Sequence, residues 1–227
     1  MKSSVITFPG SNCDRDMDVA LKKFGFNNKM VWHDNVELPK SDLVVLPGGF
    51  SYGDYLRCGS MASKSKIMKS VINFANSGGM VMGICNGFQI LVETGLVPGV
   101  LLRNKYLEFI CKNVFVKIND KKNTYFKNIE NEVLEFHIAH NEGNYFCTND
   151  QLKEIEDNEQ VAINYCDKNG KTAEQFNPNG SIKNIAGIFN KKKNVLGMMP
   201  HPERMIDPSL SGEDGSLFFK NLINNLK

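Results

Sequence analysis

The chain has 227 residues, of which 41% are hydrophobic and 23% are charged, and its formal net charge is +2. A chain of this size and composition can bury a full core, and it contains no obvious linker, so we expect one domain over residues 1–227. The near-neutral charge without a basic stripe argues against binding to nucleic acid, and no apolar stretch is long enough to span a membrane. The six cysteines lack the spacing of a disulfide framework or a metal site, so we expect reduced thiols, a cytoplasmic protein and no bound metal.

The first half of the chain alternates short β-rich segments with amphipathic helical patterns. Residues 1–8 are expected to form a strand, followed by a helix that Ser11 or Asn12 caps and that Gly25 ends. Further strands are expected at residues 29–32, 43–46 and 80–82, and further helices at residues 64–76 and 88–92. This alternation predicts a mostly parallel sheet that helices cover on both faces.

The second half is rich in β-structure. Strand-like segments lie at residues 115–118, 133–139, 161–165, 185–189 and 195–199, with Asn-Gly turns among them. A final helix places Phe218, Leu222 and Leu226 on one face. The whole pattern predicts an α/β fold, a three-layer sandwich with a mostly parallel central sheet and a smaller antiparallel β portion in the second half.

A Gly-Ile-Cys-Asn-Gly sequence at residues 83–87 lies between an expected strand and an expected helix. A nucleophile in this position sits on a sharp, strained turn, and glycines at 83 and 87 remove Cβ atoms that would block so close an approach. The turn also places Cys85 at a helix N-terminus, where unpaired N–H groups and the helix dipole stabilise an anion. Cys85 is therefore a candidate nucleophile, although a buried structural cysteine between two packing glycines would give the same pattern.

A cysteine nucleophile needs a base, and the chain has four histidines. His33 and His137 have no suggestive sequence neighbours, whereas His201 follows an apolar strand and has Glu203 two residues further on. Residues i and i+2 of an extended chain point the same way, and prolines at 200 and 202 restrict the backbone on both sides of the histidine. His201 and Glu203 are a candidate base and orienting carboxylate; the alternative is an exposed proline-rich turn.

Stabilisation of an oxyanion requires fixed hydrogen-bond donors. The N–H group of Asn86, directly after the cysteine, is one candidate, and the Pro47-Gly48-Gly49-Phe50 loop offers another. The glycine loop, the cysteine turn and His201 all follow expected strands, and open α/β sheets place their sites at the carboxyl ends of strands. We therefore expect these three segments to converge on one crevice.

Five longer motifs occur in an order that one known family shares. They are PGSNCD at residues 9–14, LPGGFSYGDYLR at 46–57, GICNGFQIL at 83–91, AHNEG at 139–143 and NVLGMMPHPER at 194–204. Together they resemble the class I, triad-type glutamine amidotransferases, and most closely the family of stand-alone glutaminase subunits of phosphoribosylformylglycinamidine synthase. The resemblance covers nearly the whole chain and is far more specific than triad spacing alone.

The resemblance implies a role for each matching position. The nucleophile, the acid and base, and the orienting carboxylate would be Cys85, His201 and Glu203. The two backbone oxyanion donors and a residue that helps to define the glutamine pocket would be Gly49, Asn86 and Gln89. The implied reaction is hydrolysis of L-glutamine to glutamate and ammonia through a cysteinyl thioester.

The resemblance also implies partners, because ammonia in neutral water is mostly protonated and must reach its acceptor through protected space. The implied acceptor protein is a synthetase subunit, assisted by a small accessory subunit. It uses ATP and Mg²⁺ to convert formylglycinamide ribonucleotide to formylglycinamidine ribonucleotide in de novo purine biosynthesis. No phosphate-binding loop or other cofactor motif is recognisable in this chain, so we expect it to hold no cofactor itself.

Polar and aromatic side chains gather in two further segments, residues 51–57 and 140–142. We expect these segments to face the synthetase, with Arg57, His140 and Glu142 coupling the two sites; ordinary solvated loops are the alternative. Two other functions remain open. A glutaminase of another biosynthetic amidotransferase would share the triad, whereas a non-catalytic regulatory subunit would have no physical reason to keep all three triad residues.

Overall fold

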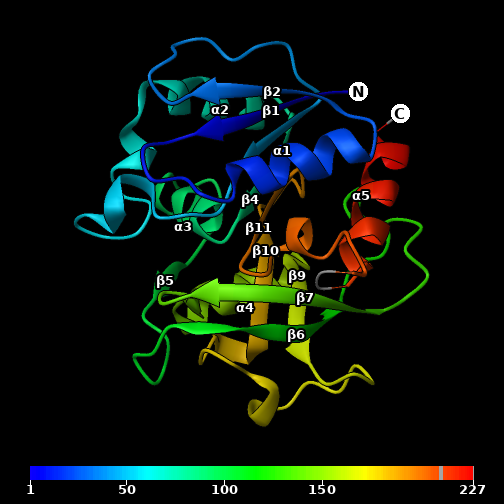
Figure 1. The fold of residues 1–227 in the computed structure, drawn as a ribbon. Helices are drawn as coiled ribbons and strands as arrows, with labels where there is room; N and C mark the ends of the chain where they lie inside the picture. The colour runs from blue at the N-terminus through cyan, green and yellow to red at the C-terminus, as the bar shows by residue number, and fades with distance from the viewer. Residues whose placement is uncertain (210–211, 227) are drawn as a thin grey trace.

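The computed structural model describes residues 1–209 and 212–226, and its strands and helices are shown in Figure 1. The first half contains β1 (Lys2–Thr7), α1 (Asp14–Lys23), β2 (Asn27–Trp32), β3 (Leu43–Leu46), α2 (Lys66–Asn76), β4 (Met80–Ile84) and α3 (Asn86–Glu93). The second half contains β5 (Val100–Leu102), β6 (Ile110–Ile118), β7 (Val133–His140), β8 (Asn144–Phe146), α4 (Asn149–Asp157), β9 (Val161–Cys166), β10 (Ile185–Phe189), β11 (Val195–Met198) and α5 (Asp214–Asn225).

One nine-stranded sheet forms the centre of the molecule, in the order β2-β1-β3-β4-β11-β10-β9-β6-β7. The strands from β2 to β11 run parallel, and each pair from β11 to β7 is antiparallel. A separate two-stranded sheet pairs β5 with β8. The expected α/β class is confirmed, and the antiparallel strands of the second half continue the parallel sheet.

Helices cover both faces of the parallel strands. The β1-α1-β2 crossover moves to one side of β1 and the β3-α2-β4 crossover moves to the other, so right-handed connections place α1 and α2 on opposite faces. Helix α5 lies on the side of α1, where Phe24 and Phe219 stack with ring centroids 5.8 Å apart. Strand β3 is buried along its full length, as expected for a strand covered on both faces. Among the described residues, no helix combines the length and apolarity that crossing a membrane requires.

The start of α1 differs from the sequence-based expectation. Cys13 occupies the cap position, and no side chain caps the helix. The hydroxyl of Ser11 accepts a hydrogen bond from the N–H of Phe8, and the side-chain oxygen of Asn12 accepts one from Cys13. Neither Ser11 nor Asn12 caps the helix as predicted, because both side chains shape the turn after β1.

Helix α4 was not predicted from the sequence. Thr148 and Gln151 form a capping box at its start, and Leu152 and Ile155 face the core. A Thr-x-x-Gln sequence before apolar residues spaced three apart is a sequence signal for such a helix. The apolar face of α4 is short, with Leu152 and Ile155 as its buried residues.

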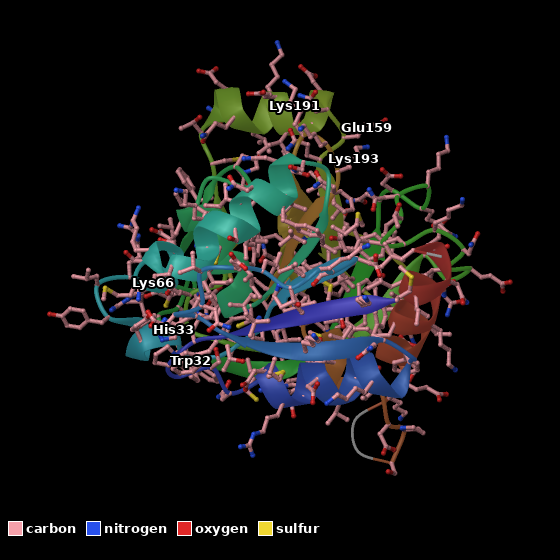
Figure 2. All side chains as sticks on the ribbon, turned by 90° about the horizontal axis from the view of Figure 1, so that it is seen from above. Trp32, His33, Lys66, Glu159, Lys191 and Lys193 are labelled. Atoms are coloured by element: carbon pink, nitrogen blue, oxygen red, sulfur yellow. The ribbon has the colours of Figure 1, made fainter. Side chains whose placement is uncertain are left out.

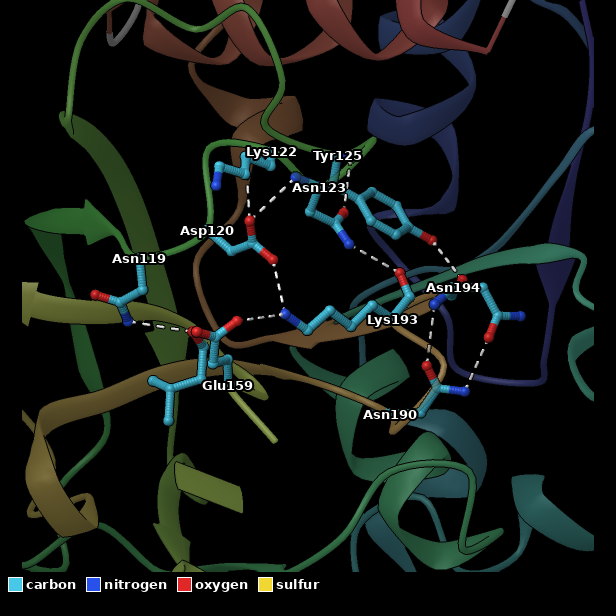
Figure 3. A network of polar contacts seen from close by, with 10 residues as sticks. Asn119, Asp120, Lys122, Asn123, Tyr125, Glu159, Asn190, Lys193 and Asn194 are labelled. Atoms are coloured by element: carbon cyan, nitrogen blue, oxygen red, sulfur yellow. Dashed lines mark hydrogen bonds and ion pairs between the residues drawn. The ribbon is translucent and has the colours of Figure 1, made fainter. Parts of the chain in front are cut away.

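A polar network fixes the amino-terminal ends of β4 and β11 (Figure 3). The buried Tyr125 hydroxyl donates to a main-chain oxygen of β4 at 2.7 Å and to the main-chain oxygen of Asn194, just before β11, at 3.1 Å. Nearby, the ammonium group of Lys193 pairs with Asp120 at 2.9 Å and with Glu159 at 3.4 Å. The network therefore sets the relative position of two adjacent strands whose opposite ends carry the candidate active site.

Candidate active site

Cys85 lies on the turn between β4 and α3, with φ +50° and ψ −105°. This left-handed conformation is strained for a residue with a side chain, and such strain concentrates at functional sites. The N–H of Cys85 donates to the oxygen of Met198 at 2.8 Å, which ties the turn to β11. A Cβ atom on Gly87 would clash with the oxygen of Leu46, and one on Gly83 would lie 2.6 Å from the oxygen of Gly87. Both glycines are needed for close approach, as predicted.

His201 and Glu203 form a buried pair beyond the carboxyl end of β11. The imidazole Nδ1 lies 2.6 Å from Glu203 Oε1, and the side chains are 1% and 0% exposed. The two side chains were predicted to meet because residues i and i+2 of an extended segment point the same way. Instead, Pro202–Arg204 form a 3₁₀ turn, and this turn brings the carboxylate beside the ring. Burial opposes the charged imidazole, but Glu203 and the sulfurs of Cys85 and Cys13 outweigh it and hold the pKa of His201 well above its usual value. The site favours an imidazolium.

The second ring nitrogen of His201 faces the cysteine side of the site. Nε2 is buried and has no hydrogen-bond partner within normal limits among the described residues, whereas the Cys85 sulfur is near enough to contribute to the raised pKa of His201. The Cys85 sulfur itself lies 3.7 Å from the oxygen of Ala139. The structure therefore brings Cys85, His201 and Glu203 together, with Nδ1 engaged and Nε2 available.

The glycine loop packs directly against the triad. A Cβ on Gly48 would lie 2.6 Å from His201 Cε1, and a Cβ on Gly49 would lie 2.8 Å from the backbone nitrogen of Asn12. Gly49 has φ +144°, which favours glycine. Asn86 is the first residue of α3, where N–H groups have no partner within the helix. The glycine loop, the cysteine turn and His201 thus meet in one place, as expected from the sequence.

Side chains of Asn86 and Gln89 connect the start of α3 to two neighbouring loops. Asn86 Oδ1 accepts from the N–H of Ser51 at 3.1 Å, and its Nδ2 donates to Gln89 Oε1 at 2.9 Å. Gln89 Nε2 donates to the oxygen of Glu142 at 2.7 Å. The nucleophile turn is therefore linked by hydrogen bonds to both segments that the sequence suggests for coupling.

The three expected coupling residues differ in exposure. Arg57 is exposed and makes a bidentate contact to Glu93 at 2.7 and 2.6 Å. The carboxylate of Glu142 lies 3.7 Å from Arg103 near the surface. His140 is 3% exposed, with Nδ1 3.0 Å from Asn104 Oδ1, so it lies beneath the surface and cannot contact a partner directly in this structure.

Cys13 is a site residue that sequence reasoning missed. Its sulfur, a His201 nitrogen and a Glu203 oxygen all lie within 4.8 Å of one another, a donor set that could hold a metal ion. In this structure the Arg204 guanidinium donates to the Cys13 sulfur at 3.0 Å, and Glu203 Oε1 is bonded to His201 Nδ1. The only sequence signal was the position of Cys13 in the PGSNCD motif.

The nucleophile is almost closed off from solvent. Cys85 is 5% exposed. A surface cavity of about 760 Å³ lies elsewhere and is lined by charged side chains that include Lys117, Asp120 and Glu159. In Figure 2, Glu159 lies at the end of the molecule opposite His33, the residue that supports the 51–57 loop through a 2.8 Å contact to Tyr52. None of Cys85, His201 and Glu203 lines this cavity.

Comparison with known proteins agrees with this geometry. Residues 1–212 match the CobB/CobQ-like glutamine amidotransferase domain. A chain of the PurLQS structure from Thermotoga maritima is 40% identical, with a TM-score of 0.88 and coverage of 100% of this chain and 99% of that one. A glutamine amidotransferase from Thermotoga maritima, 16% identical with a TM-score of 0.64 and coverage of 100% and 98%, shares the fold. Fold and site together define a glutamine amidotransferase.

A much closer relative specifies the family. Phosphoribosylformylglycinamidine synthase subunit PurQ from Pelagibacter ubique (strain HTCC1062) is 82% identical over 227 residues, which cover both chains completely. The chain belongs to the PurQ family, the glutaminase subunits of phosphoribosylformylglycinamidine synthase in purine biosynthesis.

Proposed function

We propose that the chain acts as one domain that hydrolyses L-glutamine, with Cys85 as nucleophile, His201 as acid and base, and Glu203 as the residue that orients the imidazole. The observation that carries this proposal is the buried 2.6 Å pair of His201 and Glu203 beside a cysteine held on a strained turn. A nucleophile, a base and an orienting group close to one another are the arrangement that acyl transfer requires, and this supports the proposed roles.

The mechanism begins with attack of the Cys85 thiolate on the side-chain amide carbon of glutamine. Backbone N–H groups of Gly49 and Asn86 bind the oxyanion, and each such donor contributes on the order of 100- to 1000-fold in rate. His201 Nε2 protonates the departing nitrogen, because Glu203 occupies Nδ1. Ammonia leaves and a glutamyl thioester remains. Water, deprotonated by the same nitrogen, then attacks the thioester and releases glutamate and the thiolate.

Ammonia passes to the synthetase subunit of the enzyme. That subunit uses ATP and Mg²⁺ to convert formylglycinamide ribonucleotide to formylglycinamidine ribonucleotide, with a small accessory subunit in the complex. This chain binds glutamine and holds no cofactor, and it acts in the cytoplasm. The relatives support this assignment: one is a subunit of the synthase by name, and another comes from a PurLQS structure.

The 51–57 loop forms the surface that couples hydrolysis to the synthetase. Tyr52, Asp54 and Leu56 all have positive φ values of 54° to 69°, although none is a glycine. Such a backbone is costly and persists only where the surroundings impose it. Tyr55 and Leu56 are nonetheless exposed, as is Arg57. The hydrogen bond from the N–H of Ser51 to Asn86 connects the loop to the nucleophile turn, so a partner that moves the loop would move the oxyanion site.

A labelling experiment tests the catalytic assignment. A glutamine-mimicking electrophile should form a covalent adduct at Cys85, and Cys85→Ser should abolish both the adduct and glutamate formation. Absence of an adduct in the assembled synthase would support a non-catalytic subunit instead. Formation of formylglycinamidine ribonucleotide that depends on glutamine, ATP and added synthetase would separate this function from that of another amidotransferase.

The coupling surface has its own test. Arg57→Ala should reduce the stimulation of glutaminase activity by the synthetase, because it removes the bidentate contact that holds the end of the loop to Glu93. If the synthetase stimulates Arg57→Ala as strongly as the wild type, the loop is not the coupling element.

A further inference from the structure

Cys13 connects two segments that the proposed mechanism must keep together. Its backbone N–H donates to the oxygen of Gly48 at 3.3 Å, and its sulfur accepts from the Arg204 guanidinium at 3.0 Å. Gly48 directly precedes one proposed oxyanion donor, and Arg204 directly follows Glu203. One residue at the start of α1 is therefore bonded to both the glycine loop and the triad turn.

The sulfur also packs beside the catalytic ring. A Cβ on Gly48 would lie 2.6 Å from His201 Cε1 and 3.2 Å from Cys13 Sγ, so both side chains face the same α-carbon. Cys13 is 2% exposed, so its side chain is packed in the interior. Removal of the sulfur would leave a void into which the ring and the loop could shift.

Arg204 supplies a charged donor for this contact. Its side chain is only 29% exposed and also lies 3.8 Å from Asp16. Burial lowers the pKa of Arg204, but Cys13 and Glu203 more than compensate, so the guanidinium stays charged. Hydrogen bonds from charged donors are shorter and stronger than neutral ones, which suits a contact that must hold a turn in place.

We propose that Cys13 is a positioning residue for glutamine hydrolysis, fixing His201 relative to the oxyanion donors through its contacts to Arg204 and Gly48. This inference depends on the proposed function, but it adds a residue outside the triad. Cys13 acts through other residues and not on glutamine itself. Its loss should therefore lower kcat and leave the KM for glutamine nearly unchanged, because only alignment in the transition state is affected.

The test uses the assembled synthase and glutamate formation. Cys13→Ala should lower kcat at least about tenfold with KM within about twofold, since a misplacement of about 1 Å can cost about 100-fold. Cys13→Ser should recover part of the loss, because a hydroxyl can accept from the guanidinium. Cys166→Ala is the matched control: Cys166 is similarly buried, at 4% exposed, but lies in the antiparallel strand β9. It should leave kcat unchanged.

A double-mutant cycle connects the effect to the observed contact. Arg204→Gln alone should also lower kcat, and Cys13→Ala combined with Arg204→Gln should cost less than the product of the two single losses. Multiplicative losses would overturn the proposal. So would a Cys13→Ala variant with lower Tm and full kcat, or a Cys166→Ala variant with the same loss. If Cys13→Ala does not fold, Cys13→Val, which also offers no acceptor to the guanidinium, replaces it in the cycle and decides the outcome.

The failures of the two proposals can be told apart. If the wild-type complex does not hydrolyse glutamine, or if Cys85→Ser retains full activity, the proposed function itself fails. If the wild type is active and Cys85→Ser is inactive while Cys13→Ala keeps full kcat, only the positioning role of Cys13 fails.

Discussion

Glu203 determines the protonation state of His201. The carboxylate lies against Nδ1 where both side chains are buried, and it favours the imidazolium over the neutral ring. Because the pKa of His201 is raised, the ring keeps its proton at pH values above the usual value of about 6.5. An amide in place of the carboxylate removes this attraction but leaves burial, which opposes the charge.

Glu203→Gln should therefore shift the titration of His201 to lower pH and reduce kcat for glutamine hydrolysis by about 100- to 10,000-fold. An NMR titration of the His201 ring and an assay of glutamate formation measure the two effects. Glu93→Gln, which changes a carboxylate paired with Arg57 at the surface, is the control and should leave the His201 titration in place. An unshifted titration in Glu203→Gln would contradict the assigned role.

Asn104 fixes the tautomer of His140. Its Oδ1 accepts from the N–H of Gly143 at 3.1 Å, and its Nδ2 donates to the oxygens of Glu108 and His140, so the amide orientation is determined. The oxygen that faces His140 Nδ1 must therefore accept, and Nδ1 carries the proton. Burial lowers the pKa of His140 to about 3, so the ring is neutral and its buried Nε2 is a bare acceptor.

This neutral histidine should make stability depend on pH. Its pKa in the folded state lies below the unfolded value of about 6.5, so its contribution is complete above that pH and is lost as the pH falls toward 3. The loss is about 1.4 kcal/mol per pH unit, or about 2 kcal/mol between pH 6.5 and 5. His140→Gln removes the titrating group and retains an amide donor for Asn104. Urea unfolding should show a smaller loss for the variant at pH 5, and equal losses would refute the assignment.

At the level of elements, the contact between α3 and β3 depends on Gly87. A Cβ there would overlap the oxygen of Leu46, and relief requires the helix that begins directly after Cys85 to move. Gly87→Ala should lower the free energy of unfolding by about 1–3 kcal/mol and should also reduce kcat, because the oxyanion donor moves with the helix.

Gly95→Ala provides the matched comparison. Gly95 has φ +72° and open space around its Cβ position, so alanine there strains the backbone without a clash. The cost should be about 1–2 kcal/mol, with kcat retained. Urea unfolding and glutamate formation measure both variants. Full activity in Gly87→Ala would show that the helix does not need its observed distance from β3.

Local patterns predicted most elements and missed what long-range contacts decide. Strand β3 matches its predicted bounds because four consecutive apolar residues end at a Pro-Gly-Gly turn. The predicted cap of α1 was wrong because the side chains of Ser11 and Asn12 form hydrogen bonds within the turn after β1. The 3₁₀ turn at Pro202–Arg204 and the position of Cys13 beside it depend on residues far away in sequence, which no periodicity reports.

At the scale of the whole molecule, sheet order brings the site together. The pairing of β11 with β4 in parallel, with Met198 opposite Ile84, places Cys85 and His201 beyond adjacent strand ends. The rule for open α/β sheets predicted convergence at the carboxyl ends, but no local pattern states that the last strand of the chain lies beside the fourth. The triad residues and the glycine loop could be named from sequence, whereas the position of Cys13 beside His201 and Arg204 could not.

The exposed apolar tip of the 51–57 loop gives the last prediction. Leu56 is 77% exposed in a conformation that is costly for leucine, and burial against the synthetase would remove this apolar surface from water. Leu56→Asp should therefore weaken association at least about tenfold and lower glutamine-dependent synthase activity at limiting subunit concentration. Synthase activity with added ammonia should persist, because it bypasses this chain. Sedimentation of the mixed subunits measures association. Val19→Asp, at a site on α1 that is 58% exposed, should not affect it; equal weakening by both variants would exclude the loop as the docking surface.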